Sequence, residues 1–542
     1  MLPSNSCPAY SCHKKSIAAR CFTLAGFLAL AVFFAGCGND LASLFSTTSD
    51  SGCGAIPAKP HPQGIAKVRH IIVLMQENRS FDNYFGALPY APGSPYHPGP
   101  CTSTDNQCVN ALTCSVTSGN ITCTNSNPEA DGSPAVAAFH DPKLCIQPDL
   151  DHSWTGVHKE FNYEDPNNSL NGTNDGFVSQ NDATEQSDSS ETPDDDDTMG
   201  FYTQTDLPYY YQLAQTFGIN DSYFSSIPGP TIPNRMYELA GTSFGHVVTQ
   251  GESSPPVGFD QYGYQPINGT IYDLLDHNGV CWREYIEDGL TDVDNLYGAM
   301  FREPLPPDFQ STDDFIAQAG SGDLPEVSFI DLNSQNNEHP PDDIRAGEAD
   351  VANIINAVRT GPAWKSSIIL LTWDEGGGFY DHVTPPAATP PDNIPPGMCA
   401  DNSNPPGSQT PGNGAQCSDS ATEAQKLCSM AMSGEQCAGF NQYGIRLPFV
   451  VISPFAKPGY VSHTVGDHGS ILALIETRFT PGKFLTARDQ NANDLEDMFD
   501  FDNSPSLHSK VSPSLAPPAS SSDGGCSSNS SSTGAWMPDN GR

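Results

Sequence analysis

One stretch of the chain decides its fold: His70-Ile71-Ile72-Val73-Leu74-Met75-Gln76-Glu77-Asn78-Arg79-Ser80-Phe81-Asp82-Asn83-Tyr84-Phe85-Gly86. Its first half is a continuous apolar run, which is typical of a strand buried on both faces of a sheet. Glu77 and Asn78 follow where that strand is expected to end. Ligands collect at the carboxyl ends of strands in open α/β sheets, so this carboxylate and amide are candidates for holding a metal or a phosphate. The plainer interpretation is a helix start, with Ser80 as N-cap and Asp82 near the positive helix end, but it leaves Glu77 unexplained.

Other segments of the chain repeat the pattern of a buried strand followed by a helix. Apolar runs cover residues 327–332, 367–373 and 447–452, and helical spacing covers 207–217, 349–358 and 470–479. Alternating strands and helices predict an α/β fold with a mainly parallel central sheet flanked by helices on both faces. Glycine and proline number 48 each, which indicates long irregular connections between these elements.

The charge balance of the chain is strongly acidic. The formal net charge is −41 and the isoelectric point is near 4.3, so a nucleic-acid backbone would be repelled and no nucleic-acid partner is expected. Part of this charge lies in residues 182–197, which are expected to form a solvated acidic loop. A calcium site in that loop is the alternative, although no spaced ligand pattern is visible.

The N-terminal sequence predicts export. A short basic segment precedes an apolar run over residues 21–34 and then Ala35-Gly36-Cys37, an arrangement typical of a signal peptide over residues 1–36. The run ends like a bacterial lipobox, which would attach lipid to Cys37 and hold a periplasmic or cell-surface lipoprotein at a membrane. Phe34 replaces the usual leucine of a lipobox, so ordinary cleavage and secretion is the alternative.

The rest of the chain is expected to form one large domain. The chain has 542 residues, of which 37% are hydrophobic, and can therefore bury a large core. We predict a flexible tether over residues 37–60, a folded domain over 61–502, and a disordered tail rich in Ser, Pro and Gly over 503–542.

The cysteines predict disulfide-stapled surface loops. After removal of a signal peptide and lipidation of Cys37, an even number of the 16 cysteines remains, which permits complete pairing in an oxidising compartment. They gather in two irregular stretches, one with Cys101, Cys108, Cys114, Cys123 and Cys145, the other with Cys399, Cys417, Cys428 and Cys437. A zinc site is the alternative, but no paired C-x-x-C spacing supports it.

A second group of polar residues follows the apolar run over residues 367–373. Asp374 and Glu375 stand at its end, and three glycines after them let the backbone turn sharply and approach a ligand. The segment could be only an acidic turn, yet burying two carboxylates is costly unless a cation or hydrogen bonds compensate. We therefore expect Asp374 and Glu375 to share a divalent metal ion with Glu77 and Asn78.

A threonine hydroxyl lies at the start of a predicted helix. Thr231 precedes a helix that Pro233 can begin, which places its hydroxyl at the positive end of the helix. A hydroxyl becomes a good nucleophile when a metal lowers its pKa. The local alternative is that Thr231 serves only as the N-cap.

These segments together resemble the bacterial phosphoesterase family. The motifs that carry the resemblance are Glu77-Asn78-Arg79-Ser80-Phe81-Asp82, Gly229-Pro230-Thr231 with Pro233-Asn234-Arg235, Glu338-His339-Pro340 and Asp374-Glu375-Gly376-Gly377. They occur in the family's order between about residues 67 and 478. The family includes phosphatidylcholine-type phospholipases C, plant non-specific phospholipases C and certain acid phosphatases, and it belongs to the alkaline-phosphatase-like superfamily.

The resemblance implies roles for individual residues. Glu77, Asn78, Asp374 and Glu375 become the metal and active-site ligands, and Thr231 becomes the nucleophile that forms a phospho-enzyme. Arg235 joins the catalytic residues through the spacing Thr231-x-Pro233-x-Arg235, which sulfatases share. Threonine cannot become the formylglycine that sulfatases require, which argues against sulfate ester hydrolysis.

Four histidines lie in segments similar to those of the family. The resemblance implies that His152 and His339 are active-site residues, and imidazoles titrate near physiological pH, as proton transfer requires. His382 and His468 are also candidates, with roles that the resemblance leaves open. A structural role is the alternative for each of them.

The implied function is that of an exported, metal-dependent phosphoesterase. Phosphodiesters of phospholipids are the expected substrates, as in phospholipase C, and an acid phosphatase acting on small phosphate monoesters is the alternative. A lipid-anchored binding protein without catalysis is the alternative from another class. The divalent metal is not specified, because oxygen ligands suit calcium, magnesium or manganese, whereas nearby histidines admit zinc or iron.

Overall fold

The computed structural model describes six segments of the chain: residues 63–185, 196–249, 267–287, 308–400, 415–503 and 515–519. The predicted signal peptide, the tether with Cys37, residues 186–195 of the acidic loop and most of the predicted tail lie outside these segments. Within them, none of the helices has the length and apolar character needed to cross a membrane.

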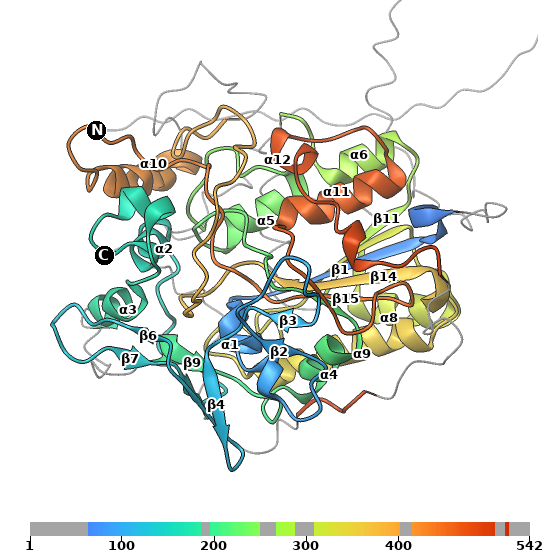
Figure 1. Cartoon of the computed structure of the whole chain (residues 1–542). Helices are drawn as coiled ribbons and strands as arrows, with labels where there is room; N and C mark the ends of the chain where they lie inside the picture. The colour runs from blue at the N-terminus through green and yellow to red at the C-terminus, as the bar shows by residue number, and fades with distance from the viewer. Residues whose placement is uncertain are drawn as a thin grey trace, which may run out of the picture. The chain divides into compact units, whose positions relative to one another are not determined.

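A central eight-stranded sheet has the order β12-β11-β13-β1-β14-β15-β10-β16 (Figure 1). Its strands are β1 (His70–Gln76), β10 (Gly218–Asn220), β11 (Trp282–Ile286), β12 (Phe309–Ser311), β13 (Val327–Asp331), β14 (Ser367–Trp373), β15 (Phe449–Ile452) and β16 (Tyr460–Ser462). Strand β1 pairs in parallel with both β13 and β14, whereas β15 runs antiparallel to β14 and β10. Every residue of β1 and β14 is buried, as their apolar runs predict. The mainly parallel sheet is therefore confirmed.

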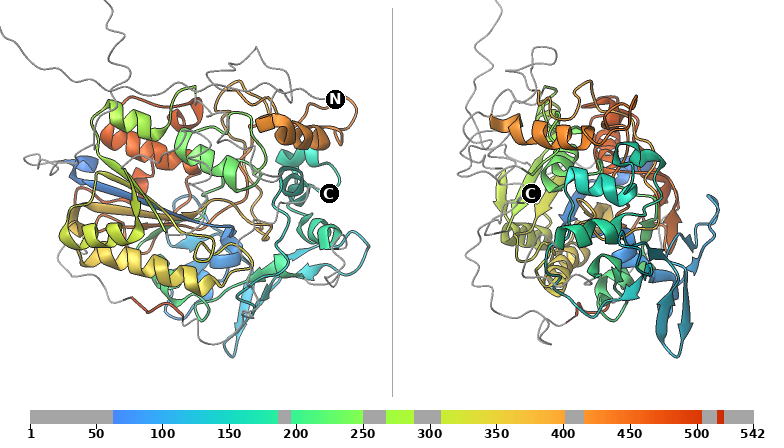
Figure 2. Two further views of the ribbon diagram at one scale, coloured as in Figure 1. Left: turned by 180° about the vertical axis from the view of Figure 1, so that it is seen from behind. Right: turned by 90° about the vertical axis from the view of Figure 1, so that its left-hand side faces the viewer.

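Helices cover both faces of this sheet, which confirms the predicted α/β class. They are α1 (Phe81–Phe85), α2 (Trp154–Phe161), α3 (Phe177–Glu185), α4 (Pro208–Thr216), α5 (Thr231–Ala240), α6 (Ile271–His277), α8 (Thr312–Ser321), α9 (Ile344–Thr360), α10 (Ala415–Cys428), α11 (His468–Phe479) and α12 (Ala487–Gln490). Helices α5, α6 and α11 lie on one face, and α4, α8 and α9 lie on the other (Figure 2). Helices α2, α3 and α10 pack together beside the sheet. The helices predicted over residues 207–217, 349–358 and 470–479 are present as α4, α9 and α11.

Short strands and disulfides organise the long connections. The short strands are β2 (His97–Pro98), β3 (Cys108–Val109), β4 (Cys114–Thr117), β5 (Asn120–Cys123), β6 (Ser126–Asn127), β7 (Val136–Ala137), β8 (Phe139–His140) and β9 (Gly200–Phe201). Disulfides join Cys101 to Cys108, Cys114 to Cys123, and Cys428 to Cys437. The predicted disulfide-stapled loops are thus confirmed.

The loops after β1 and β14 lie against each other at the carboxyl ends of the strands. Asn78 adopts a left-handed φ of 59°, and Gly377 and Gly378 have φ values of 59° and 73°. A Cβ atom on Gly377 would lie 2.7 Å from the carbonyl oxygen of Asn78, and one on Gly378 would lie 2.5 Å from the Cβ atom of Leu150. The predicted sharp turn and close approach are therefore present, and they bring the segment before α2 to the same edge of the sheet.

Candidate active site

Asp374 joins the ends of two neighbouring strands. Its Oδ1 atom accepts hydrogen bonds from the backbone N–H of Asn78 at 3.1 Å and from that of Glu375 at 2.7 Å. The register between β1 and β14 places Gln76 opposite Trp373, so the residues that follow meet at one edge. Asn78 and Asp374 therefore lie side by side, although 296 positions separate them in the sequence.

Several buried polar atoms at this edge have no hydrogen-bond partner within the described part of the chain. They include Asn78 Oδ1 and Nδ2, Asp374 Oδ2 and Glu375 Oε1. The second oxygen of Glu375 accepts a hydrogen bond from the backbone N–H of Gly377 at 2.6 Å. Unpaired buried oxygens are costly, and a cation that accepts them as ligands removes that cost. The residues present therefore fit a divalent cation.

Arg235 supplies positive charge to the same place. Its Nη2 atom lies 3.2 Å from Glu77 Oε1, its Nη1 atom lies 3.6 Å from Asp331 Oδ1, and its Nε atom lies 4.0 Å from Asp374 Oδ2. The side chain is 1% exposed, so these interactions act with little screening by water. Arg235 thus lies closest to Glu77, whereas its distance of 4.0 Å from Asp374 Oδ2 is too long for a hydrogen bond.

Sequence reasoning missed two acidic neighbours of the site. Asp331 is the last residue of β13, at the same edge of the sheet as the ends of β1 and β14, and its place at the end of the predicted strand over 327–332 was the available signal. Glu160 in α2 is fully buried, and its Oε1 atom has no hydrogen-bond partner among the described residues. It lines a small pocket together with Glu375, Gly229 and Ser225. No local pattern distinguishes Glu160 from an ordinary helix residue.

Thr231 is the first residue of α5. Pro230 occupies the cap position and offers no side-chain hydrogen bond, so the alternative that Thr231 is the N-cap is wrong. Residues four apart share one face of a helix, which places Thr231 on the same side as Arg235. Its side chain is buried, at 4% exposure. The backbone N–H groups of Thr231 and Ile232 at the start of this helix offer a place for an anion.

Burial changes the acidity of the two carboxylates after β14. It raises the pKa of Glu375 to about 8, because the charged form loses its hydration, and Asp374 adds to the rise through its negative charge. Burial also raises the pKa of Asp374, although the positive charge of Arg235 opposes that change. A cation bound at this edge would favour the charged forms of both.

His152 lies beside Glu375, and His339 lies beside His152. The Nε2 atom of His152 is 3.8 Å from Glu375 Oε1, and that of His339 is 3.8 Å from Asp149 Oδ2. Their ring centroids are 5.9 Å apart. Both side chains are partly exposed, at 17% and 28%, so they can meet a substrate.

His468 lies behind the carboxylates. It is fully buried, its Nε2 atom is 2.7 Å from the carbonyl oxygen of Asp374, and its Nδ1 atom is 3.1 Å from the hydroxyl of Tyr223. Burial lowers its pKa to about 3, which keeps the ring neutral. These contacts fit a residue that positions the backbone of Asp374.

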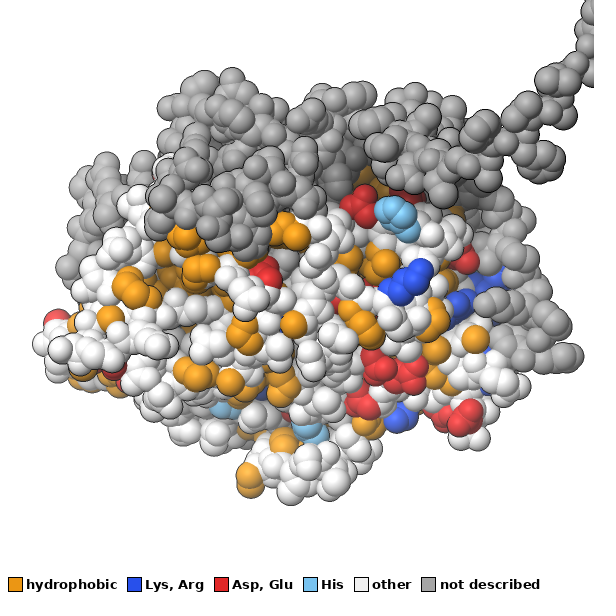
Figure 3. All heavy atoms as spheres, turned by 90° about the horizontal axis from the view of Figure 1, so that it is seen from above, with side chains coloured by type: hydrophobic (Ala, Val, Ile, Leu, Met, Phe, Trp, Pro, Cys, Tyr) orange, Lys and Arg blue, Asp and Glu red, His pale blue; other side chains and the backbone are white. Residues whose placement is uncertain are grey.

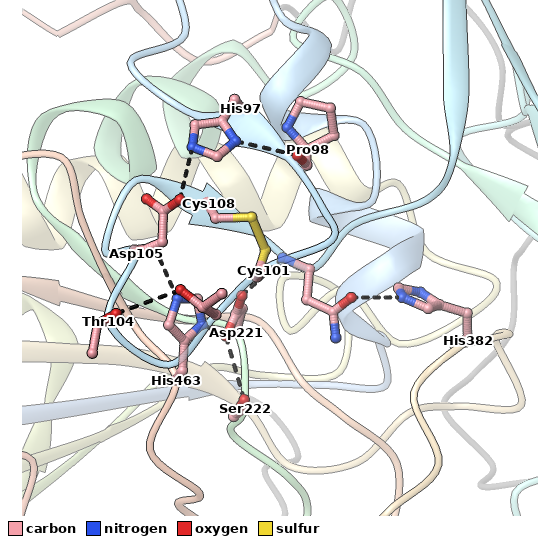
Figure 4. Close-up of a disulfide and its surroundings, with 12 residues drawn as sticks. His97, Pro98, Cys101, Thr104, Asp105, Cys108, Asp221, Ser222, His382 and His463 are labelled. Atoms are coloured by element: carbon pink, nitrogen blue, oxygen red, sulfur yellow. Dashed lines mark hydrogen bonds and ion pairs between the residues drawn. A yellow bond between two sulfur atoms is a disulfide. The ribbon is translucent and has the colours of Figure 1, made fainter.

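His382 belongs to a separate buried network. Its Nδ1 atom lies 2.6 Å from Asp82 Oδ2. Its Nε2 atom lies 3.1 Å from Asn110 Oδ1, the contact of His382 that Figure 4 draws. Arg446 lies 3.0 Å from the other oxygen of Asp82 and 3.1 Å from Asp381. Burial opposes protonation of His382, but the charge and hydrogen bond of Asp82 outweigh it and raise the pKa. This network fixes the start of α1, where Ser80 accepts the hydrogen bond of Asn83 N–H as the predicted N-cap.

The site therefore combines oxygen ligands, a helix start with a hydroxyl, a buried arginine and two partly exposed imidazoles, a set that suits chemistry on a phosphate ester. The model of the Phosphoesterase family matches residues 68–480. The chain belongs to this family and is a hydrolase acting on phosphate esters, as the resemblance in its sequence implies.

Named relatives extend over most of the chain. It is 31% identical over 471 residues to Phospholipase C B of Mycobacterium tuberculosis, covering 82% of this chain and 80% of that protein. It is 28% identical over 474 residues to Non-specific phospholipase C1 of Arabidopsis thaliana, covering 82% and 73%. Among solved structures, a protein of the alkaline phosphatase superfamily from Vibrio parahaemolyticus matches 52% of this chain and 62% of that one, with 12% identity and a TM-score of 0.27.

Proposed function

We propose that this protein is an exported, metal-dependent phospholipase C that hydrolyses phosphodiesters of phospholipids through the hydroxyl of Thr231. The observation that carries the proposal is the set of buried oxygens of Asn78, Asp374 and Glu375 that lack hydrogen-bond partners among the described residues. The oxygen of Asp374 lies 4.0 Å from Arg235, which shares a helix face with Thr231. The relatives named as phospholipases C support the choice of a phospholipid substrate.

Asn78, Asp374 and Glu375, with Glu77 next to them, are the residues that would hold the metal. A bound divalent cation there would lower the pKa of the nucleophilic hydroxyl and neutralise charge on the phosphate. Oxygen ligands suit magnesium, calcium or manganese, and His152 close to Glu375 also admits zinc or iron.

The residues of the chain itself account for the remaining steps. Thr231 Oγ loses its proton to solvent and attacks phosphorus while the bond from phosphorus to the diacylglycerol oxygen breaks in line with it. The start of α5 binds the phosphate oxygens through its N–H groups, and Arg235 holds Glu77 and Asp374 in place. The departing oxygen takes a proton from His152 or His339. Water then releases the phosphorylated head group from Thr231, and the same histidine accepts the proton of that water. Thr231 Oγ regains a proton from solvent as it leaves phosphorus.

The proposed location rests on the predicted signal peptide and on the disulfides. Disulfides persist in oxidising compartments, which supports a periplasmic or cell-surface location with a lipid anchor on Cys37, or secretion. We assign the catalytic domain to residues 61–502. Among the coloured side chains on the face seen from above, basic ones are sparse beside acidic ones (Figure 3). The formal net charge of −41 favours an uncharged or zwitterionic lipid over an anionic one.

A phosphomonoesterase with the same residues is the rival within this class, and a non-catalytic lipid-anchored binding protein is the rival outside it. The test compares hydrolysis of phosphatidylcholine in mixed micelles with that of an aryl phosphate monoester, before and after chelation. We expect the diester to be the better substrate and chelation to remove both activities. Preference for the monoester would favour the phosphatase, and activity unaffected by full metal removal would overturn the metal-dependent mechanism.

Thr231→Val and Thr231→Ser form a matched pair for the nucleophile. The valine variant keeps the shape of the side chain but has no hydroxyl, so it should fold and be inactive. The serine variant should keep part of the activity and should carry the phosphorylated head group on residue 231 when the reaction is quenched. Equal activity of the valine variant and the wild type would refute the assignment.

A further inference from the structure

A disulfide-bonded segment covers one edge of the central sheet. Strand β16 stands at the end of the strand order, next to β10. Residues 97–112, which contain the disulfide between Cys101 and Cys108, contact its other side. The backbone N–H of Val461 donates to the carbonyl oxygen of Asn106 at 2.9 Å, and Asn106 Nδ2 donates to the carbonyl oxygen of Val461 at 2.8 Å. This segment, called the strap below, therefore pairs backbone groups that an edge strand otherwise exposes.

His463 joins the strap to the sheet. It follows β16 directly and lies between Asp105 and Asp221 (Figure 4). Its Nε2 atom lies 3.0 Å from the carbonyl oxygen of Asp105 in the strap, and its Nδ1 atom lies 2.7 Å from Asp221 Oδ1. A carbonyl oxygen and an ionised carboxylate can only accept hydrogen bonds, whereas a neutral imidazole has a single N–H. Both contacts are therefore hydrogen bonds only when His463 is an imidazolium.

Asn110 holds the other end of the strap. Its backbone N–H donates to Asp221 Oδ2 at 2.8 Å, and its carbonyl oxygen accepts from Arg446 Nη1 at 2.6 Å. Its Oδ1 atom lies 3.1 Å from His382 Nε2, while His382 Nδ1 lies 2.6 Å from Asp82 Oδ2. Both ring nitrogens of His382 thus face oxygen atoms as well, and both contacts again require an imidazolium.

The charges around His463 favour its protonated form. The hydrogen bond to Asp221 raises the pKa of His463 above its ordinary value of 6.5, burial opposes the rise, and the negative charges of Asp221 and Asp105 add to it. The carboxylate of Asp105 also lies 3.3 Å from the ring of His97 in the strap.

The charges around His382 act in the same direction. Burial lowers the pKa of His382, but the charge and hydrogen bond of Asp82 raise it by more, so the net shift is upward. Arg446 opposes that rise and Asp381 supports it.

The geometry points to a pH-sensitive clamp: the strap is held on the edge of the sheet while His463 and His382 are protonated, and it is released when both rings lose a proton to solvent. A group with a raised folded pKa stabilises fully below its unfolded pKa, and this stabilisation is lost as the pH rises through the folded pKa. The strap is thus closed in acidic surroundings and opens as the pH rises above 6.5. Opening exposes the edge of β16, and this inference does not depend on the proposed function.

The test measures backbone hydrogen exchange of the whole, disulfide-bonded protein by mass spectrometry at pH 5.5 and pH 8.5. Each rate is divided by the intrinsic rate at the same pH, and α9 serves as the internal reference for global opening. Each unit by which a histidine pKa exceeds 6.5 changes the opening equilibrium by a factor of about ten. We expect protection of residues 97–112 and of β16 to fall by roughly tenfold or more at the higher pH relative to α9.

The variants separate the clamp from other effects of pH. In His463→Gln the strap should be open at both pH values and lose most of its pH dependence, and the double variant with His382→Gln should lose all of it. His140→Gln is the matched control, because His140 pairs with Asp206 at 2.8 Å outside the strap. It should keep the behaviour of the wild type.

Exchange of the C2 hydrogen of the imidazole ring gives the pKa of His463 directly in the wild-type protein. We expect a value above 6.5. A value below 6.5 would overturn the proposal, as would equal protection of the strap at both pH values relative to α9. The same pH dependence in the wild type and the double variant would also overturn it.

Discussion

The metal-free protein should lose stability as the pH rises, because of Glu375. Its pKa is raised from 4.5 to about 8 in the folded chain. A group with a raised folded pKa leaves stability intact below its unfolded pKa and reduces it as the pH rises through the folded pKa. The shift of about 3.5 units corresponds to at most about 5 kcal/mol at 1.36 kcal/mol per unit.

Thermal unfolding of chelated protein between pH 5 and pH 9 measures this effect. The melting temperature of wild type should fall across that range, and Glu375→Gln, which has no charge to bury, should show a clearly weaker fall. Glu435→Gln changes an exposed carboxylate and should behave like wild type. Excess divalent cation should flatten the wild-type curve, since it binds the ionised carboxylate. Parallel curves for wild type and Glu375→Gln without metal would refute the reasoning.

Three further changes test the parts of the site separately. Glu77→Gln removes the carboxylate that lies 3.2 Å from Arg235. It should lower kcat/KM by roughly 10²- to 10³-fold with little change in melting temperature. A near-normal kcat/KM would contradict a role of Glu77 in the site. Gly377→Ala places a Cβ atom 2.7 Å from the carbonyl oxygen of Asn78 at a φ of 59°, so it should destabilise by about 1 to 2 kcal/mol and weaken metal binding in calorimetry. Unchanged metal affinity would show that this turn does not set the site. Asp82→Asn removes the carboxylate that pairs with Arg446 and His382. It should lower the free energy of unfolding, measured with denaturant, by about 3 to 5 kcal/mol. A loss below about 1 kcal/mol would mean that water or other groups compensate for the missing charge.

The arrangement of the strands could be predicted only in part. The apolar runs of β1 and β14 are long and uninterrupted, so hydropathy alone locates them and shows that both of their faces are buried. Strand β15 has the same local character, yet it runs antiparallel to its neighbours. Strand direction depends on the path of the connecting chain, which hydropathy does not record.

The residues of the candidate site could also be predicted only in part from the sequence. Glu77, Asn78, Asp374 and Glu375 could be named because they follow recognisable strands in motifs that resemble a family. Glu160 and Asp331 could not, since a single carboxylate in a helix or at a strand end has no local mark of its function. The different surroundings of His382 and His339 also depend on side chains that lie far away in sequence.

The sequence by itself determined the α/β class, the buried strands and the family to which the chain belongs, because these depend on local apolar runs and on short motifs. Only the tertiary structure decided which polar and charged side chains lie in contact. The pairing of Asn78 with Asp374, of Arg235 with Glu77 and of Glu375 with His152 each crosses more than 150 residues. Such contacts arise because parallel strands align their carboxyl ends at one edge of a sheet, which brings together polar residues that the chain keeps far apart.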